Sequence, residues 1–78
     1  MSTKNHVNLS SVSAGSKYRI KRIQLPPETN QRLRELGFNE NAIIRTIIKD
    51  SSKLICEINN TRVGIHQIIA DDIFVSPL

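Results

Sequence analysis

Residues 31–38 read Gln31-Arg32-Leu33-Arg34-Glu35-Leu36-Gly37-Phe38. They combine an apolar helix face, a signal for the end of a helix, and a pair of apolar residues that can pack together across that end. Leu33 and Leu36 are three residues apart and share one face of a helix. Gly37 follows directly, and glycine is the residue best suited to the left-handed C′ position that ends a helix. Leu33 then becomes C3 and Phe38 becomes C″, the two positions whose side chains meet in a Schellman cap. The stretch therefore predicts a short helix that ends at Leu36.

A strand is expected before this helix. Residues 17–25 alternate in polarity, and a slip in the alternation predicts a bulge near Lys21-Arg22. Pro26-Pro27 should end the strand, because proline cannot donate to a sheet ladder. Thr29 or Asn30 is then expected to cap the start of the helix.

A second strand is expected after the helix, beyond a turn at Asn39-Glu40-Asn41. Asn41 suits a left-handed position in that turn, since asparagine tolerates positive φ. Residues 42–49 predict a central strand with apolar side chains on both faces. One face would carry Ile44, Thr46 and Ile48, and the other Ile43 and Ile47.

The C-terminal part predicts further short elements. They are a hairpin turn at 50–53, a strand at 54–58 with Leu54, Cys56 and Ile58 on one face, a tight turn at Asn59-Asn60, a strand at 62–66, a helical turn at 67–71 and a last strand at 72–75. About five strands, one short helix and a C-terminal helical turn predict a mainly β protein, a small barrel. We expect residues 1–8 to form a flexible N-terminal tail and residues 9–78 a single domain.

The charge of the chain is unevenly placed, with a net charge of +4. One early block contains Lys17, Arg19, Lys21, Arg22, Arg32 and Arg34, with Glu28 as its single acid. Such a block permits binding to nucleic acid, to anionic lipid or to an acidic protein surface. Its structural interpretation is a solvated strand edge, because exposed lysines also deter pairing between edges.

The single cysteine, Cys56, excludes an internal disulfide, and no secretory signal pattern opens the chain. We therefore expect a cytoplasmic protein. No apolar run approaches the roughly 20 residues that span a bilayer, so we expect no direct membrane insertion.

An ordered series of segments supports a resemblance over most of the chain, from about Leu9 to Val75. The series consists of Leu9 with Gly15, the basic strand 18–23, the helix stop 32–38, the strand 44–48, Arg62-Val63-Gly64-Ile65, and 69–75. In this order it resembles the FeoA family, small cytoplasmic SH3-like barrels associated with bacterial ferrous-iron transport. The resemblance implies a non-enzymatic accessory protein. It also implies a partner, the FeoB-type membrane ferrous-iron transporter with its cytoplasmic GTPase domain.

The chain departs from the family pattern at two places. Asn41 stands where the family usually has glycine, and the turn at 50–53 is shorter than the family's loop, so a partner contact carried by that loop is in doubt here. The resemblance also extends to the SH3-like domains of iron-dependent repressors, in which a Glu and a Gln three residues later reach a metal. Glu28 and Gln31 are similar in spacing to that pair, but the chain lacks a winged-helix domain for reading operators.

The residue types and their spacing give weak support for metal binding and for catalysis. The candidate ligands are His6, Glu28, Gln31, Cys56 and His66, which form no recognised ligand spacing, so we expect no cofactor and no metal site. Cys56 alternates with apolar residues, and a structural role as a small buried side chain is expected there. Neither a nucleophile elbow nor a phosphate-binding glycine loop is present in the sequence, and no catalytic residue is predicted.

The helix stop is the strongest candidate for a functional surface. Leu33, Gly37 and Phe38 are expected to form a structural cap over the barrel. The candidate partner-binding residues are Arg32, Arg34, Glu35, Leu36, Arg19 and Arg22, because an apolar centre with an arginine rim is a common composition for a protein interface.

Two alternatives to docking on the transporter stay open. The first is a basic barrel that binds nucleic acid, although Tyr18 is the only aromatic residue in the basic strand and single-strand binders usually interleave several. The second is a metal-sensing domain related to the iron-dependent repressors. The sequence does not define the oligomeric state, and a weak homo-oligomer is one of the states that it allows.

Overall fold

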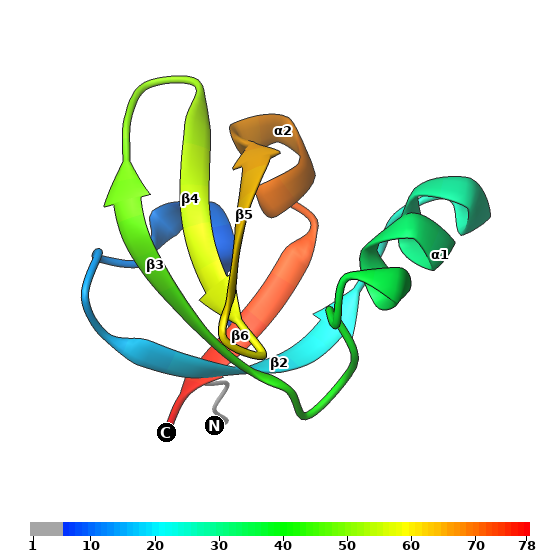
Figure 1. The fold of residues 1–78 in the computed structure, drawn as a ribbon, viewed down its shortest axis with the longest axis horizontal. Helices are drawn as coiled ribbons and strands as arrows, with labels where there is room; N and C mark the ends of the chain where they lie inside the picture. Colours follow the sequence, from blue (N-terminus) through cyan, green and yellow to red (C-terminus); the bar gives the residue numbers. More distant parts are fainter. Residues whose placement is uncertain (1–5) are drawn as a thin grey trace.

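The computed structural model describes residues 6–78, which form a small β barrel with a helix set to one side (Figure 1). Its elements are β1 (Val7–Asn8), η1 (Leu9–Ser11), β2 (Lys17–Ile23), α1 (Pro27–Glu35), β3 (Ile43–Lys49), β4 (Lys53–Ile58), β5 (Thr61–His66), α2 (Gln67–Ala70) and β6 (Ile73–Pro77). The described strands make one antiparallel sheet in the order β1-β6-β2-β3-β4-β5. The predicted mainly β barrel is confirmed.

The N-terminal edge of the sheet begins earlier than expected. Val7 and Asn8, which we placed in the flexible tail, form β1 and pair with Val75 and Phe74 of β6. The Asn8 side-chain amide and the Ser10 hydroxyl both donate hydrogen bonds to Asp71, which ties this segment to the turn after α2. The first five residues of the predicted tail lie outside the described part of the chain.

The predicted bulge in the basic strand is confirmed. The register of β2 on β6 shifts between Ile20 and Arg22. The extra residue lets Ile20 and Ile23, three positions apart, both turn toward the core. The strand ends at Ile23, two residues before the predicted limit at Leu25.

A second bulge, in β3, overturns one expected orientation. The register on β4 shifts between Thr46 and Ile48, so Ile47 is the extra residue. Ile48 consequently pairs with Ile55 on the outer face, where it is 56% exposed. The expectation that Ile48 shares a face with Ile44 and Thr46, which are buried, was wrong. The central position of β3, between β2 and β4, was predicted.

The hairpin turns follow from local chemistry. The Asp50 carboxylate accepts hydrogen bonds from the N–H groups of Ser52 and Lys53, both at 2.9 Å, as in an Asx turn. These bonds favour the ionised carboxylate and hold the pKa of Asp50 below its usual value. Asn59 and Asn60 both have positive φ, at 53° and 61°, which is the conformation of a tight two-residue hairpin turn.

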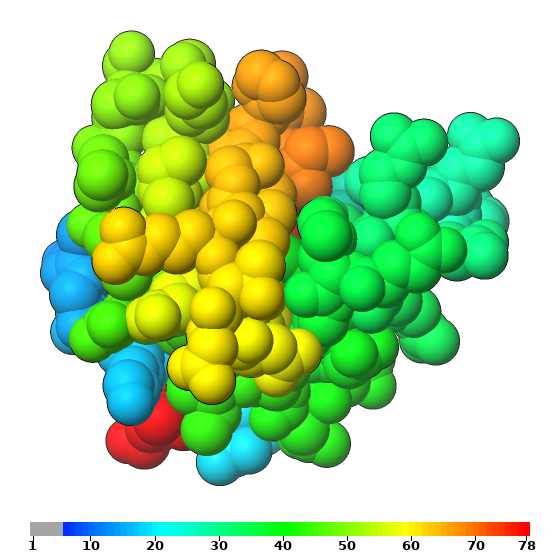
Figure 2. All heavy atoms as spheres, in the orientation of Figure 1, coloured from blue at the N-terminus to red at the C-terminus, as the bar shows by residue number. Residues whose placement is uncertain are grey.

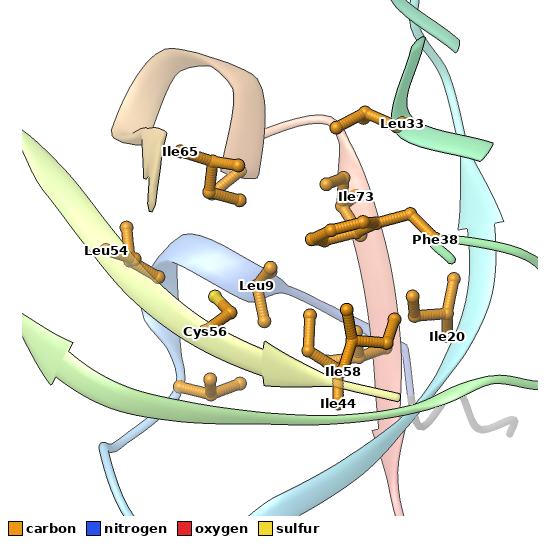
Figure 3. Close-up of a cluster of buried hydrophobic side chains, with 13 residues drawn as sticks. Leu9, Ile20, Leu33, Phe38, Ile44, Leu54, Cys56, Ile58, Ile65 and Ile73 are labelled. Carbon is orange, nitrogen blue, oxygen red and sulfur yellow. The ribbon is translucent and has the colours of Figure 1, made fainter. Parts of the chain in front are cut away.

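The core is one cluster of buried apolar side chains from the strands, the η1 segment, α2 and the helix stop (Figure 3). Its members are Leu9, Val12, Ile20, Leu33, Phe38, Ile44, Leu54, Cys56, Ile58, Ile65, Ala70, Ile73 and Val75. Phe38 is fully buried, and Figure 3 shows its ring directed into the cluster, toward Ile73. The last residue of the helix stop therefore fills the core of the barrel.

Candidate functional site

The C-terminal end of α1 is a complete Schellman cap, as predicted. The Phe38 N–H donates to the Leu33 carbonyl at 2.9 Å, and the Gly37 N–H donates to the Arg34 carbonyl at 3.0 Å. Gly37 has φ of 106°, a conformation that strongly favours glycine. Leu33 and Phe38 are both buried. The structural cap assigned to Leu33, Gly37 and Phe38 is thus formed.

The N-terminal end of α1 differs from the prediction. The helix begins at Pro27 with Pro26 at the N-cap position, and no side chain caps it. The expected caps, Thr29 and Asn30, lie inside the first turns instead. Proline at the first helical position needs no hydrogen-bond partner and already has helical φ, so the prolines that end the strand also start the helix.

The helix stop is held against the barrel by close backbone packing at Gly37. A Cβ atom placed on Gly37 would lie 2.3 Å from the Asn59 side-chain nitrogen. Asn59 belongs to the turn between β4 and β5, so the end of α1 rests directly on that turn. This contact joins two segments that are 22 residues apart in the chain and gives the helix end a defined position.

The rest of α1 projects from the barrel. In the space-filling view it extends beyond the body of the molecule, with a notch between it and α2 (Figure 2). Leu33 is the one buried residue of α1, which the structure describes in full. Arg32, Arg34 and Glu35 are exposed, and Leu36 is 41% exposed. Four of the predicted partner-binding residues therefore lie together at the exposed end of the helix.

Two hollows flank the helix. One, of about 320 Å³, is lined by Glu28, Thr29 and Arg32 of α1 and by Ile69 of α2. The other, of about 330 Å³, is lined by Pro27, Asn30, Gln31 and Arg34.

Glu28 and Gln31, the pair that resembles the repressor segment, line different hollows. Within residues 6–78, no three His, Cys, Asp or Glu side chains come close enough to hold a metal ion together.

Arg19 and Arg22, the other predicted contact residues, have partners within the molecule. The Arg19 guanidinium donates to the Asn41 carbonyl at 3.1 Å, in the turn that follows the helix stop. The Arg22 guanidinium lies over the Phe74 ring, 5.6 Å from its centroid, which is a cation–π distance. Arg19 therefore contacts the turn that follows the helix stop, whereas Arg22 contacts the neighbouring strand β6.

Cys56 and His66 do not form a reactive pair. Cys56 is fully buried between β3 and β5, and this burial raises the pKa of its thiol to about 11. His66 is exposed at the end of β5, opposite Lys53. A buried thiol with a raised pKa is a poor nucleophile, which agrees with the structural role expected for Cys56.

The sequence did not point to three features of this region. They are the contact between Gly37 and Asn59, the outward orientation of Ile48, and the 77% exposure of Ile68 on α2. The first two depend on tertiary packing and on a bulge. Ile68 could have been found, because an apolar residue in a single helical turn has few neighbours to cover it.

A comparison with protein-family models matches residues 7–77 to the FeoA domain. The chain belongs to the FeoA family. Members of this family are accessory proteins involved in ferrous-iron transport, and the family is not a family of enzymes. A comparison with curated proteins finds no match.

Solved FeoA structures share the fold. A crystal structure of an iron uptake regulatory protein (FeoA) aligns with a TM-score of 0.86 and 23% identity, over 94% of this chain and 99% of that one. The solution structure of iron(II) transport protein A from Clostridium thermocellum aligns with a TM-score of 0.86 and 26% identity, over 92% of this chain and 46% of that one. The SH3-like FeoA fold is confirmed.

The same fold forms part of larger repressors. A manganese-dependent transcriptional repressor in complex with manganese aligns with a TM-score of 0.89 and 17% identity, over 99% of this chain. The aligned region is 39% of that repressor. At this level of identity the likeness concerns the fold alone.

No helix within the described residues is long and apolar enough to cross a membrane.

Proposed function

We propose that this FeoA protein acts in the cytoplasm as a non-enzymatic accessory of ferrous-iron uptake. It docks on the cytoplasmic part of the FeoB-type transporter and modulates the activity or assembly of that transporter. GTP hydrolysis belongs to the GTPase domain of the transporter. Family membership supports the involvement in iron transport.

The exposed end of α1 is the observation that carries the docking proposal. Its cap fixes Leu33 and Phe38 in the barrel, while Leu36 and the charged side chains of Arg32, Arg34 and Glu35 face solvent. A half-exposed leucine with arginines beside it can bury apolar area and form charge-assisted hydrogen bonds with a partner. Because two hydrogen bonds of the cap already fix the backbone here, ordering this backbone on binding costs little conformational entropy.

A titration against the transporter tests this proposal. The chain is added to full-length FeoB-type transporter and to its isolated cytoplasmic domain, in the GDP-bound and GTP-analogue-bound states, and binding is measured by calorimetry. We expect Leu36→Asp and Arg34→Glu each to weaken binding by at least about tenfold, the effect of a central interface residue.

Matched control variants separate a lost contact from a general change of charge. Val7→Asp changes a residue of similar exposure, 42%, on β1. Lys17→Glu reverses an exposed charge at the first residue of β2, and this strand starts on the side of the barrel away from α1 (Figure 1). Both controls should bind like the wild type. Absence of binding by the wild-type chain in every nucleotide state, or equal losses in the controls, would overturn the proposal.

A further inference from the structure

The edge strand β5 leaves backbone groups without partners on its outer side. Across residues 6–78, β5 pairs with β4 alone. The two-residue turn at Asn59-Asn60 makes Ile58 and Thr61 a hydrogen-bonded pair, and bonded and non-bonded pairs alternate from there. Arg62 and Gly64 stand in non-bonded pairs, so their N–H and C=O groups point away from β4. A free edge of this kind is a template for a further strand.

Three rows of side chains cross the outer face of the sheet and end at this edge. The middle row contains Ile48, Ile55 and the bare backbone of Gly64; one flanking row contains Lys17, Arg45, Glu57 and Arg62; the other contains Lys53 and His66. The middle row is apolar and partly exposed. Such an apolar row is typical of a sheet that continues with another strand, and here the next strand after β5 is absent from the described residues.

Each flanking row carries a basic side chain at or next to the edge, Arg62 in one row and Lys53 in the other. Glu57 forms an ion pair with Arg45 at 2.7 Å, which leaves the positive charge of Arg62 less compensated. Lys53 has His66 as its cross-strand neighbour, so the second row carries no acid. The edge thus presents Arg62 on one side of the apolar row, and on the other side Lys53 lies one strand in from the edge, next to His66.

We propose that the free edge of β5 binds an extended segment of a partner protein by strand addition. The segment has an apolar residue opposite Gly64 and carboxylates two positions to either side, opposite Arg62 and His66. Side chains of a strand repeat every second residue on one face, so these three residues continue the three rows. Backbone hydrogen bonds to Arg62 and Gly64 supply the sequence-independent part of the affinity.

Gly64 is suited to this role because it has no side chain. A Cβ atom placed there would lie only 3.3 Å from the Ile55 side chain, so Ile55 extends over Gly64 toward the edge. An incoming apolar side chain can cover Ile55 across the glycine.

A second copy of the chain is a poorer occupant of this edge. Antiparallel pairing centred on Gly64 would place Gly64 of one copy opposite Gly64 of the other, so no side chain would cover Ile55. It would also bring two Arg62 side chains to the interface without a new carboxylate. The proposed segment supplies both the apolar side chain and the carboxylates.

A peptide titration of the full chain, followed by amide chemical shifts in NMR spectra, tests the proposal without the transporter. The probes are blocked peptides of sequence TETVTET and TKTVTKT, which differ only in the sign of their charges. We expect saturable shifts of the Arg62, Gly64 and His66 amides with TETVTET, and binding of TKTVTKT at least about fivefold weaker. No saturable shift up to roughly millimolar peptide, or shifts centred elsewhere, would overturn it. So would concentration-dependent shifts of the same amides without peptide, which would assign the edge to self-association.

Two variants sharpen the test. Arg62→Glu should reduce or reverse the preference for TETVTET, whereas Lys21→Glu, an exposed charge in the β2 bulge, should leave it unchanged. Gly64→Pro removes an N–H that does not serve the β4 ladder, so it should abolish peptide binding in a folded protein. Unchanged binding by a folded Gly64→Pro variant contradicts strand addition. If that variant fails to fold, unchanged peptide preference in Arg62→Glu overturns the proposal.

Discussion

The inner and outer sides of the end of α1 contain the same residue type in two different roles. Leu33 is 5% exposed and packs in the core, whereas Leu36, three residues later, is 41% exposed. The helix ends between them, because Leu36 is already the C-cap residue and the chain turns at Gly37. The comparison teaches that a helix stop can divide a leucine pair into a structural half and a half that is available to a partner.

Among the changes on the inner side of the helix end, removal of the Phe38 ring should have the largest effect on the stability of the protein. Phe38 is fully buried, so Phe38→Ala loses its transfer free energy and leaves a cavity. We expect a loss of about 3–5 kcal/mol in the free energy of unfolding, measured by urea denaturation. A loss of about 0.5 kcal/mol or less, the scale of an exposed position, would contradict the anchoring of the helix stop by this ring.

Substitution of Gly37 should have the next largest effect. Gly37→Ala meets both an unfavourable positive φ and the Asn59 side chain at 2.3 Å from the new Cβ atom. Gly15→Ala is the matched control, because Gly15 has φ of 99° but no atom within 4 Å of a Cβ atom. We expect losses of about 1 kcal/mol for Gly15→Ala and about 2 kcal/mol or more for Gly37→Ala.

The difference between the two glycine variants measures the contact with the β4–β5 turn. Replacement of Asn59 by glycine removes the obstructing side chain and keeps a residue that accepts positive φ. The double variant Gly37→Ala/Asn59→Gly should therefore show a loss close to that of Gly15→Ala. If Gly37→Ala and Gly15→Ala cost the same from the start, the helix end does not depend on the packing at Asn59.

Backbone conformations that demand a particular residue type were well predicted from the sequence. The left-handed positions at Gly37, Asn41, Asn59 and Asn60 all carry glycine or asparagine, and each was placed correctly in a turn. The cap at Leu33 was predictable for the same reason, since the spacing of apolar residue, glycine and apolar residue encodes it locally.

Features that depend on residues far apart in the chain could not be predicted. The bulge at Ile47 is followed by a second isoleucine, Ile48. A register shift between two identical residues does not change the polarity pattern, so the sequence does not indicate that Ile48 turns outward. The packing of Gly37 on Asn59 depends on the tertiary arrangement of α1 and the sheet.

The start of α1 was missed for a local reason. Pro27 was interpreted as a strand terminator, although proline is equally suited to the first position of a helix.

The smallest expected effect concerns the outer side and sharpens the comparison of the two leucines. Leu36→Ala removes a side chain that is already 41% exposed, so the free energy of unfolding should change by no more than about 0.5 kcal/mol. Leu33→Ala, at 5% exposure, should lose about 2 kcal/mol or more and serves as the matched comparison. Both values are obtained from urea denaturation of the full chain. A cost for Leu36→Ala equal to that for Leu33→Ala would show that Leu36 is part of the structural cap, and its use as a probe of docking would then fail.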